Sequence, residues 1–246
     1  MLPVTCTIIA MNEADRIAHT IQSVNGLVSE VLVIDGGSSD DTVAVCERLG
    51  ARVIHNPWHG FGPQKRLAED QASHDWILNL DADEYLSPEL CRELAQLLKS
   101  DIPNERAFRT RIRVVYPGHD MPTRFADYHN YIRLYNRTST RFRNSLTHDE
   151  VLPTDDVVQL RGEILHRSYR AVSHIVRKFL DYAELQKAER GQTRKIGALR
   201  IAFELPFQFF KYYILRRHVF GGRAGFVYAM TLAVSRWLRL VMIAGW

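Results

Sequence analysis

The amino-acid sequence predicts an α/β protein with a mostly parallel sheet and flanking helices. Short apolar, often β-branched runs at 4–10, 30–34, 52–55 and 76–80 are typical of buried strands. Segments with the apolar spacing or the start signals of a helix follow each of these runs. Strands that alternate with helices form parallel sheets through right-handed crossovers.

The intervening segments predict helices at about 14–24, 41–49 and 64–72, and a fourth that begins at Ser87-Pro88. Ser87 suits the N-cap and Pro88 the first helical position. Ser39 or Asp40 is the expected N-cap of the second helix. Further along, the patterns predict three strands and one long helix, at 108–115, 131–135, 157–160 and 171–189.

The 246 residues allow one or two domains, and their charge is unevenly distributed. Residues 1–189 contain 22 basic and 27 acidic residues, whereas residues 190–246 contain 10 basic residues and a single acid, Glu204. The net charge of +4 therefore originates in the tail. A split of this kind indicates a separate partner for the tail, such as anionic lipid or nucleic acid.

The cysteines and the N-terminus favour a cytosolic setting. Cys6, Cys46 and Cys91 are scattered and odd in number, so we expect reduced thiols and no disulfide framework. The first residues lack a basic segment followed by an apolar one, so we expect no signal peptide.

Polar residues follow three of the predicted strands, at Asn12-Glu13, at Asp35 and at Asp81-Ala82-Asp83. Carboxyl ends of parallel strands share one edge of a sheet, where ligands bind in open α/β folds. Two carboxylates one residue apart can share a hard divalent cation. Each residue alone could be a cap or turn former, but their convergence predicts a site for a nucleoside diphosphate and a metal ion.

Two common nucleotide-binding motifs are missing from the sequence. It contains neither G-x-G-x-x-G nor G-x-x-x-x-G-K-[ST]. Their absence argues against a dinucleotide-dependent oxidoreductase and a P-loop NTPase.

Three motifs together resemble family 2 glycosyltransferases of the GT-A fold: Ile8-Ile-Ala-Met-Asn-Glu-Ala14, Val33-Ile-Asp-Gly-Gly-Ser-Ser-Asp-Asp-Thr42 and Leu78-Asn-Leu-Asp-Ala-Asp-Glu84. The resemblance implies that Asp35 binds the nucleoside of a UDP-sugar, with support from Asn12 or Glu13. It implies that Asp81 and Asp83 face the diphosphate and hold Mg²⁺ or Mn²⁺, and that Lys65 or Arg66 lies near the donor.

Four shorter stretches narrow the resemblance to bacterial lipopolysaccharide inner-core β-1,4-glucosyltransferases. They are Gly60-Phe-Gly-Pro-Gln-Lys65, Thr147-His-Asp-Glu150, His166-Arg-Ser-Tyr169 and Gly221-Gly-Arg-Ala-Gly225. The resemblance implies an inverting transferase that moves glucose from UDP-glucose to a heptose of a lipid-linked core oligosaccharide. Its location would be cytoplasmic, peripherally associated with the inner membrane.

The resemblance places the catalytic base at His148-Asp149-Glu150. An inverting transfer requires a carboxylate within hydrogen-bond reach of the attacking acceptor hydroxyl. The subgroup has His followed directly by Glu, whereas Asp149 intervenes here. Asp149 is the first candidate base and Glu150 the second. His148 could orient the base, contact the diphosphate, or serve as a structural turn residue.

We expect a GT-A domain over residues 1–170, with a nucleotide-sugar half at 1–100 and an acceptor half at 101–170, and a helical extension at 171–246. The extension's aromatic runs with basic flanks fit an anchor at an anionic membrane surface. Its apolar run at 224–234 is too short to span a bilayer, so we expect no transmembrane helix. A helical pair packed on the domain or in a dimer is the alternative.

Other functions remain open at this stage. A polyprenyl-phosphate sugar transferase would share the first hundred residues, and a non-catalytic, membrane-held nucleotide-sugar-binding module would share the fold. Nucleic acid is not an expected partner, because residues 1–189 are net negative and the basic residues of the tail are interleaved with apolar runs. The basic run Arg133, Arg137, Arg141 and Arg143 fits a solvated strand face or contacts with phosphate groups.

Overall fold

A computed structural model describes residues 2–123, 128–145, 150–177, 180 and 196–245. The chain divides into two compact units, which are described separately below. The first unit comprises Met1–Arg113 and Tyr128–His166, and the second comprises Val114–Asp127 and Arg167–Trp246. The division into a GT-A domain at 1–170 and a helical extension at 171–246 stays a prediction.

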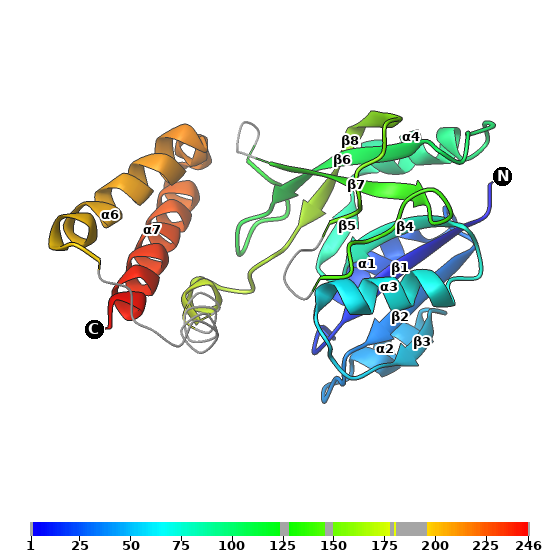
Figure 1. Ribbon diagram of the computed structural model, residues 1–246, viewed down its shortest axis with the longest axis horizontal. Helices are drawn as coiled ribbons and strands as arrows, with labels where there is room; N and C mark the ends of the chain where they lie inside the picture. The colour runs from blue at the N-terminus through cyan, green and yellow to red at the C-terminus, as the bar shows by residue number, and fades with distance from the viewer. Residues whose placement is uncertain (1, 124–127, 146–149, 178–179, 181–195, 246) are drawn as a thin grey trace. The chain divides into compact units, whose positions relative to one another are not determined.

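The first unit is built on one sheet, in which the described strands follow the order β3-β2-β1-β4-β7-β6-β8-β5 (Figure 1). Strands β3, β2, β1 and β4 are parallel, β7 is antiparallel to both β4 and β6, and β5 is antiparallel to β8. The strands are β1 Val4–Ala10, β2 Glu30–Asp35, β3 Arg52–His55, β4 Trp76–Asp81, β5 Glu84–Leu86, β6 Ala107–Val114, β7 His129–Asn136 and β8 Val157–His166.

Helices cover both faces of this sheet. Three of them, α1 Ile17–Val24, α2 Thr42–Arg48 and α4 Pro88–Leu97, pack against one face, where their apolar residues join a cluster with β1 and β4. The helix α3 Phe61–Gln71 contributes Ala68 to a separate cluster with Ile34 and Ile77. The predicted α/β architecture is confirmed, and the sheet is mixed because β7 runs antiparallel to its neighbours β4 and β6 and β5 runs antiparallel to β8.

One local expectation is wrong, and one short strand was not predicted. Neither Ser39 nor Asp40 is the N-cap of α2, because Asp41 takes that position and the Asp40 carboxylate accepts from the Thr42 N–H at 3.0 Å. The short strand β5, between Asp83 and the Ser87 cap of α4, was not expected. Its three residues carry no periodicity of their own, and pairing with β8 creates the strand.

The second unit contains a helical hairpin. Helix α6 Ala198–Phe210 continues into the π-helical turn η1 Lys211–Leu215, and the 3₁₀ turn η2 His218–Gly221 leads into α7 Gly222–Ala244. An aromatic cluster with Tyr116, Tyr212 and Tyr228 holds these elements together. Gly225 permits the turn, since a Cβ there would lie 1.9 Å from the His218 carbonyl oxygen.

The expectation that the apolar run at 224–234 is too short to span a bilayer is not supported by the length of α7. The sequence suggested an apolar run of about a dozen residues, whereas α7 continues through Arg236 and Arg239 for 23 residues. The segment His218–Ile243 is long and apolar enough to cross a membrane by length and composition alone. One such helix is weak support, because buried helices of soluble proteins also meet this standard.

Candidate active site

The strand register brings the predicted polar residues of the first unit to one edge of the sheet. Ala10 of β1 pairs with Asp35 of β2, and Ile9 pairs with Asp81 of β4. Asn12 and Glu13 follow β1 directly, and Asp83 follows β4. These residues lie together because parallel strands in register end at the same edge.

Asp35 is a buried carboxylate that organises the Gly36-Gly37 turn. It accepts from the N–H groups of Gly37 and Ser38, both at 3.0 Å, and lies 3.3 Å from His55 Nδ1. Burial alone would raise the pKa of Asp35, but these hydrogen bonds lower it below its ordinary value. A buried anion beside a glycine turn can accept a ligand N–H or hydroxyl.

Asn12 adopts a left-handed backbone conformation with φ of 58°. Its side-chain oxygen accepts from the Ser39 N–H at 2.8 Å, and its own N–H donates to Ser38 Oγ at 2.9 Å. Asn tolerates this conformation better than most residues. Asn12 therefore connects the end of β1 to the turn after β2 through hydrogen bonds.

Glu13 reaches Asp83 through an intermediate arginine. The Arg16 side chain donates to the Glu13 carboxylate at 2.8 Å, and its Nη1 lies 3.3 Å from Asp83 Oδ2. Sequence reasoning did not select Arg16. Its position four residues after Asn12, at the start of α1, was the available signal.

Asp81 lies in a buried network of charges. Its Oδ1 accepts from Lys65 Nζ at 2.8 Å, and its Oδ2 lies 3.7 Å from Arg133 Nη2. Arg133 also donates to Glu84 at 2.7 Å. Burial would raise the pKa of Asp81, but Lys65 and Arg133 hold it well below its ordinary value. Arg66 instead donates to the Phe142 carbonyl at 3.3 Å.

Asp83 faces His166, the last residue of β8. Its Oδ1 lies 3.2 Å from His166 Nε2. Burial by itself would lower the pKa of His166, but Asp83, Glu84 and Asp81 raise it above its ordinary value. The sequence motif at 166–169 had flagged His166 without a role. The antiparallel pairing of Glu84 with His166 places the imidazole beside the Asp-x-Asp segment.

The pair of Asp83 and His166 fits two ligands of a divalent ion. Neighbouring ligands of an octahedral ion, each about 2.1 Å from it, lie about 3 Å apart. The 3.2 Å between Oδ1 and Nε2 is compatible with that spacing. No cluster of three or more His, Cys, Asp or Glu residues arranged for a metal occurs among the described residues. Remaining ligands would then come from diphosphate and water, as Mg²⁺ sites commonly use.

The proposed base lies largely outside the described residues. His148 and Asp149 are outside them, and only Glu150 is described. Glu150 is exposed, and its carboxylate lies 3.3 Å from Arg143 Nε. Their catalytic roles remain proposals.

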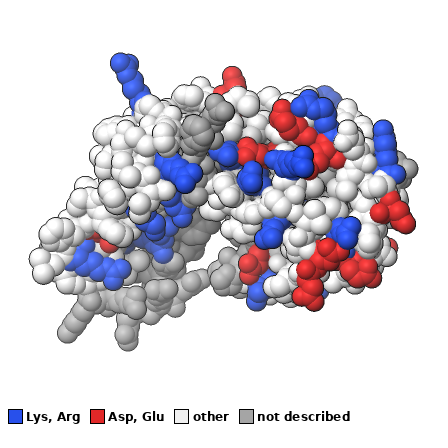
Figure 2. Space-filling view, turned by 90° about the horizontal axis from the view of Figure 1, so that it is seen from above, with Lys and Arg blue, Asp and Glu red and all other residues white. Residues whose placement is uncertain are grey.

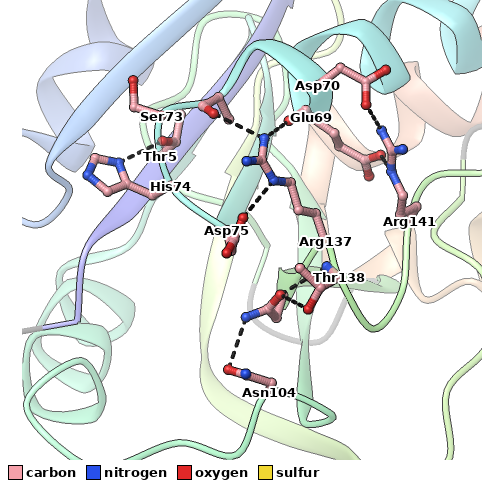
Figure 3. Close-up of polar contacts among 12 residues, drawn as sticks. Thr5, Glu69, Asp70, Ser73, His74, Asp75, Asn104, Arg137, Thr138 and Arg141 are labelled. Atoms are coloured by element: carbon pink, nitrogen blue, oxygen red, sulfur yellow. Dashed lines mark hydrogen bonds and ion pairs between the residues drawn. The ribbon is translucent and has the colours of Figure 1, made fainter.

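The basic run after Arg133 is used for internal contacts (Figure 3). Arg137 pairs with Asp75 at 3.0 Å, and Arg141 pairs with the buried Glu69 at 2.7 Å and with Asp70. These side chains reach from the segment after β7 to the end of α3 and the loop beyond it. The expectation of a solvated face or phosphate contacts is therefore wrong for Arg137 and Arg141, whose donors contact protein carboxylates.

Comparison with known proteins shows the family of this chain. The family model described as "Glycosyl transferase family 2" matches residues 5–144. The chain belongs to this family. An uncharacterized glycosyltransferase of Rickettsia felis is 37% identical over 99% of this chain and 90% of its own length.

A more distant relative has a more specific description. The lipopolysaccharide core biosynthesis glycosyltransferase LpsC of Rhizobium meliloti is 29% identical, over 98% of this chain and 92% of its own length. Among solved structures, S. aureus TarS 1–349 covers 97% of this chain and 92% of that chain at 12% identity, with a TM-score of 0.49.

Proposed function

We propose that this family 2 glycosyltransferase transfers a sugar from a UDP-sugar, with UDP-glucose as the donor, to a lipopolysaccharide core acceptor with inversion at the anomeric centre. The observation that carries the proposal is the meeting of Asp35, Asp81, Asp83 and His166 at one sheet edge. The relative LpsC supports the acceptor class. The donor and the heptose acceptor rest on sequence resemblance.

Each residue has a proposed task at the donor. Asp35 accepts from the nucleoside, while Asn12 and the Glu13–Arg16 pair hold the surrounding turns. Asp83 and His166 hold Mg²⁺ or Mn²⁺, which offsets the charge of the leaving diphosphate. Lys65 orients Asp81 and supplies a second positive charge beside the phosphates. Asp83 and His166 are thus the proposed metal ligands, and Asp81 holds Lys65 in place through their hydrogen bond.

The acceptor side requires a proton acceptor. As the acceptor oxygen attacks the anomeric carbon, the bond from that carbon to the diphosphate breaks, and a carboxylate takes the hydroxyl proton. Asp149 is the proposed base, with Glu150 as the second candidate and His148 as an orienting residue. Comparing Asp149→Asn with Glu150→Gln in single-turnover assays would identify the base by the larger loss of rate.

The first test measures binding of UDP with and without Mn²⁺ by calorimetry. Asp83→Asn keeps the shape of the side chain but removes a charged ligand, so we expect Mn²⁺ to stop enhancing UDP affinity, a loss of at least tenfold. Asp101→Asn, at an exposed carboxylate on a loop, is the matched control. Undiminished metal-dependent binding in Asp83→Asn would contradict the metal assignment.

Acceptor assays separate the candidate functions. Transfer from UDP-glucose to a delipidated core oligosaccharide supports the proposal, whereas transfer only to a polyprenyl phosphate supports the alternative enzyme. Binding of a UDP-sugar with no transfer to either acceptor favours a non-catalytic module.

The second unit supports peripheral attachment to an anionic membrane. The outward side of α6 is apolar, with Leu199, Phe203, Phe207 and Phe210 each at least half exposed. The left part of the surface in Figure 2 is largely uncharged, with patches of Lys and Arg drawn in blue. Apolar side chains with basic flanks are typical of helices that lie at a membrane interface.

A further inference from the structure

The first unit carries a row of arginines on β6 that the donor site does not use. Arg109, Arg111 and Arg113 alternate with Thr110 and Ile112, which are buried. Alternate residues of a strand point to one face, so the three guanidinium groups share the face opposite Ile112. Ile112 belongs to the cluster that α1, α2 and α4 cover.

A tyrosine organises two of these arginines. The guanidinium carbons of Arg111 and Arg113 lie 5.2 Å and 5.8 Å from the centre of the Tyr128 ring. Both distances are within the range of cation–π attraction. Tyr128 is 43% exposed, so a ligand can reach the ring and the two guanidinium groups beside it.

The row keeps an excess of positive charge. Arg113 pairs with Glu163 of β8 at 2.8 Å. Within the described part of the chain, Arg109 and Arg111 form no ion pair. Glu163 offsets one of the three positive charges, and a bound anion would offset the repulsion among those that remain. Planar guanidinium groups also bind phosphate and carboxylate through paired hydrogen bonds.

The strand directions bring Arg113, at the carboxyl end of the row, to the edge that holds Asp83 and His166. β6 is antiparallel to β7, and β7 is antiparallel to β4, so β6 and β4 run the same way. Their carboxyl ends therefore share an edge. β6 lies two strands from β4, about 10 Å at the usual strand spacing. Glu163, the partner of Arg113, lies on the strand that ends at His166.

We propose that Arg109, Arg111 and Arg113, with Tyr128, form a subsite for an anionic substituent of the acceptor oligosaccharide. The subsite rests on the proposed function, because it assumes an acceptor sugar at the edge near His166. The distance suits a substituent on a sugar unit beside the one that reacts. Phosphate and carboxylate groups share the required chemistry, and the experiment distinguishes them.

The experiment measures binding of a delipidated lipopolysaccharide core oligosaccharide to the full chain in the presence of UDP and Mn²⁺. Three probes are compared: the untreated oligosaccharide, the same material after phosphatase treatment, and the same material with its carboxylates amidated. The variant is Arg111→Gln. Arg92→Gln is the control, since Arg92 is an exposed arginine on α4, which packs on the opposite face.

We expect Arg111→Gln to weaken binding of the untreated probe at least tenfold and to leave UDP affinity unchanged. The probe that lacks the recognised group should bind wild type and variant equally. Equal binding of the phosphatase-treated probe identifies phosphate as the recognised group, and equal binding of the amidated probe identifies carboxylate. Equal binding of the untreated probe by wild type and Arg111→Gln, or an equal loss for all three probes, would overturn the subsite.

The two proposals fail differently. Absence of UDP binding in the wild-type protein would contradict the proposed function. Normal UDP binding, together with an Arg111→Gln variant that binds the untreated oligosaccharide as tightly as wild type, would contradict the subsite alone. Thermal unfolding of Arg111→Gln, compared with Arg92→Gln, verifies that any loss of binding does not reflect loss of the fold.

Discussion

Buried and half-buried carboxylates in this protein serve different purposes according to the groups that face them. Asp35 meets backbone N–H groups and holds a turn, whereas Asp83 meets Arg16 and His166. Glu30, at the start of β2, accepts from Thr5 at 2.7 Å, from Arg52 at 2.8 Å and from the Ser73 N–H at 2.8 Å. It thereby ties β1, β3 and the approach to β4 together.

Glu30 predicts a specific pH dependence of stability. Burial would raise its pKa, but hydrogen bonds from Ser73, Thr5 and Arg52 lower it from 4.5 to about 2. As the pH falls below 4.5, the unfolded chain takes up the proton first, so stability falls between about pH 4.5 and pH 2. Glu30→Gln should cost about 1–3 kcal/mol at pH 7.

Chemical denaturation of wild type and Glu30→Gln at several pH values measures this effect. The difference in unfolding free energy should shrink as the pH approaches 2. Glu47→Gln, at an exposed residue of α2, should show no comparable difference. A difference for Glu30→Gln that is the same at pH 7 and pH 2.5 would contradict the assignment.

At the scale of elements, close approach between helix and strand depends on one glycine. A Cβ at Gly162 of β8 would lie 2.4 Å from Leu90 Cα and 2.5 Å from Leu90 N of α4. These are backbone atoms of a buried helix turn, which cannot rotate away. The packing of α4 on β8 therefore requires a residue without a side chain at this position.

Gly162→Ala should destabilise the protein by about 1–3 kcal/mol, because α4 must move to admit a methyl group. Urea unfolding provides the measurement. Arg161→Ala, at the adjacent exposed residue, should change stability by no more than about 0.5 kcal/mol. If Gly162→Ala unfolds at the wild-type urea concentration, the close contact with Leu90 is not maintained in solution.

At the scale of the whole molecule, the two compact units have different surfaces. In the described residues of α6, the outward positions are mostly apolar, and the helix buries no residue fully. A water-facing helix normally presents polar residues outward. The hairpin is therefore the part of the molecule expected to meet the membrane.

Vesicle sedimentation tests that expectation. Phe203→Glu combined with Phe207→Glu should reduce binding to phosphatidylglycerol vesicles at least tenfold, since two exposed aromatic rings are replaced by negative charges. Wild type should bind phosphatidylcholine vesicles more weakly. Glu47→Gln in the first unit is the control. Unchanged vesicle binding by the double variant would refute attachment through α6.

The sequence alone was sufficient to identify the α/β fold, the first four strands and the edge where Asn12, Asp35 and Asp81 meet. Local apolar runs indicate the strands, their alternation with helices makes them parallel, and the carboxyl ends of parallel strands share an edge. The tertiary structure decided what those residues contact: Lys65 on Asp81, Arg16 and His166 on Asp83, and Arg137 and Arg141 on the end of α3. These partners are separated along the chain, and only strand order and helix packing determine which charges become neighbours.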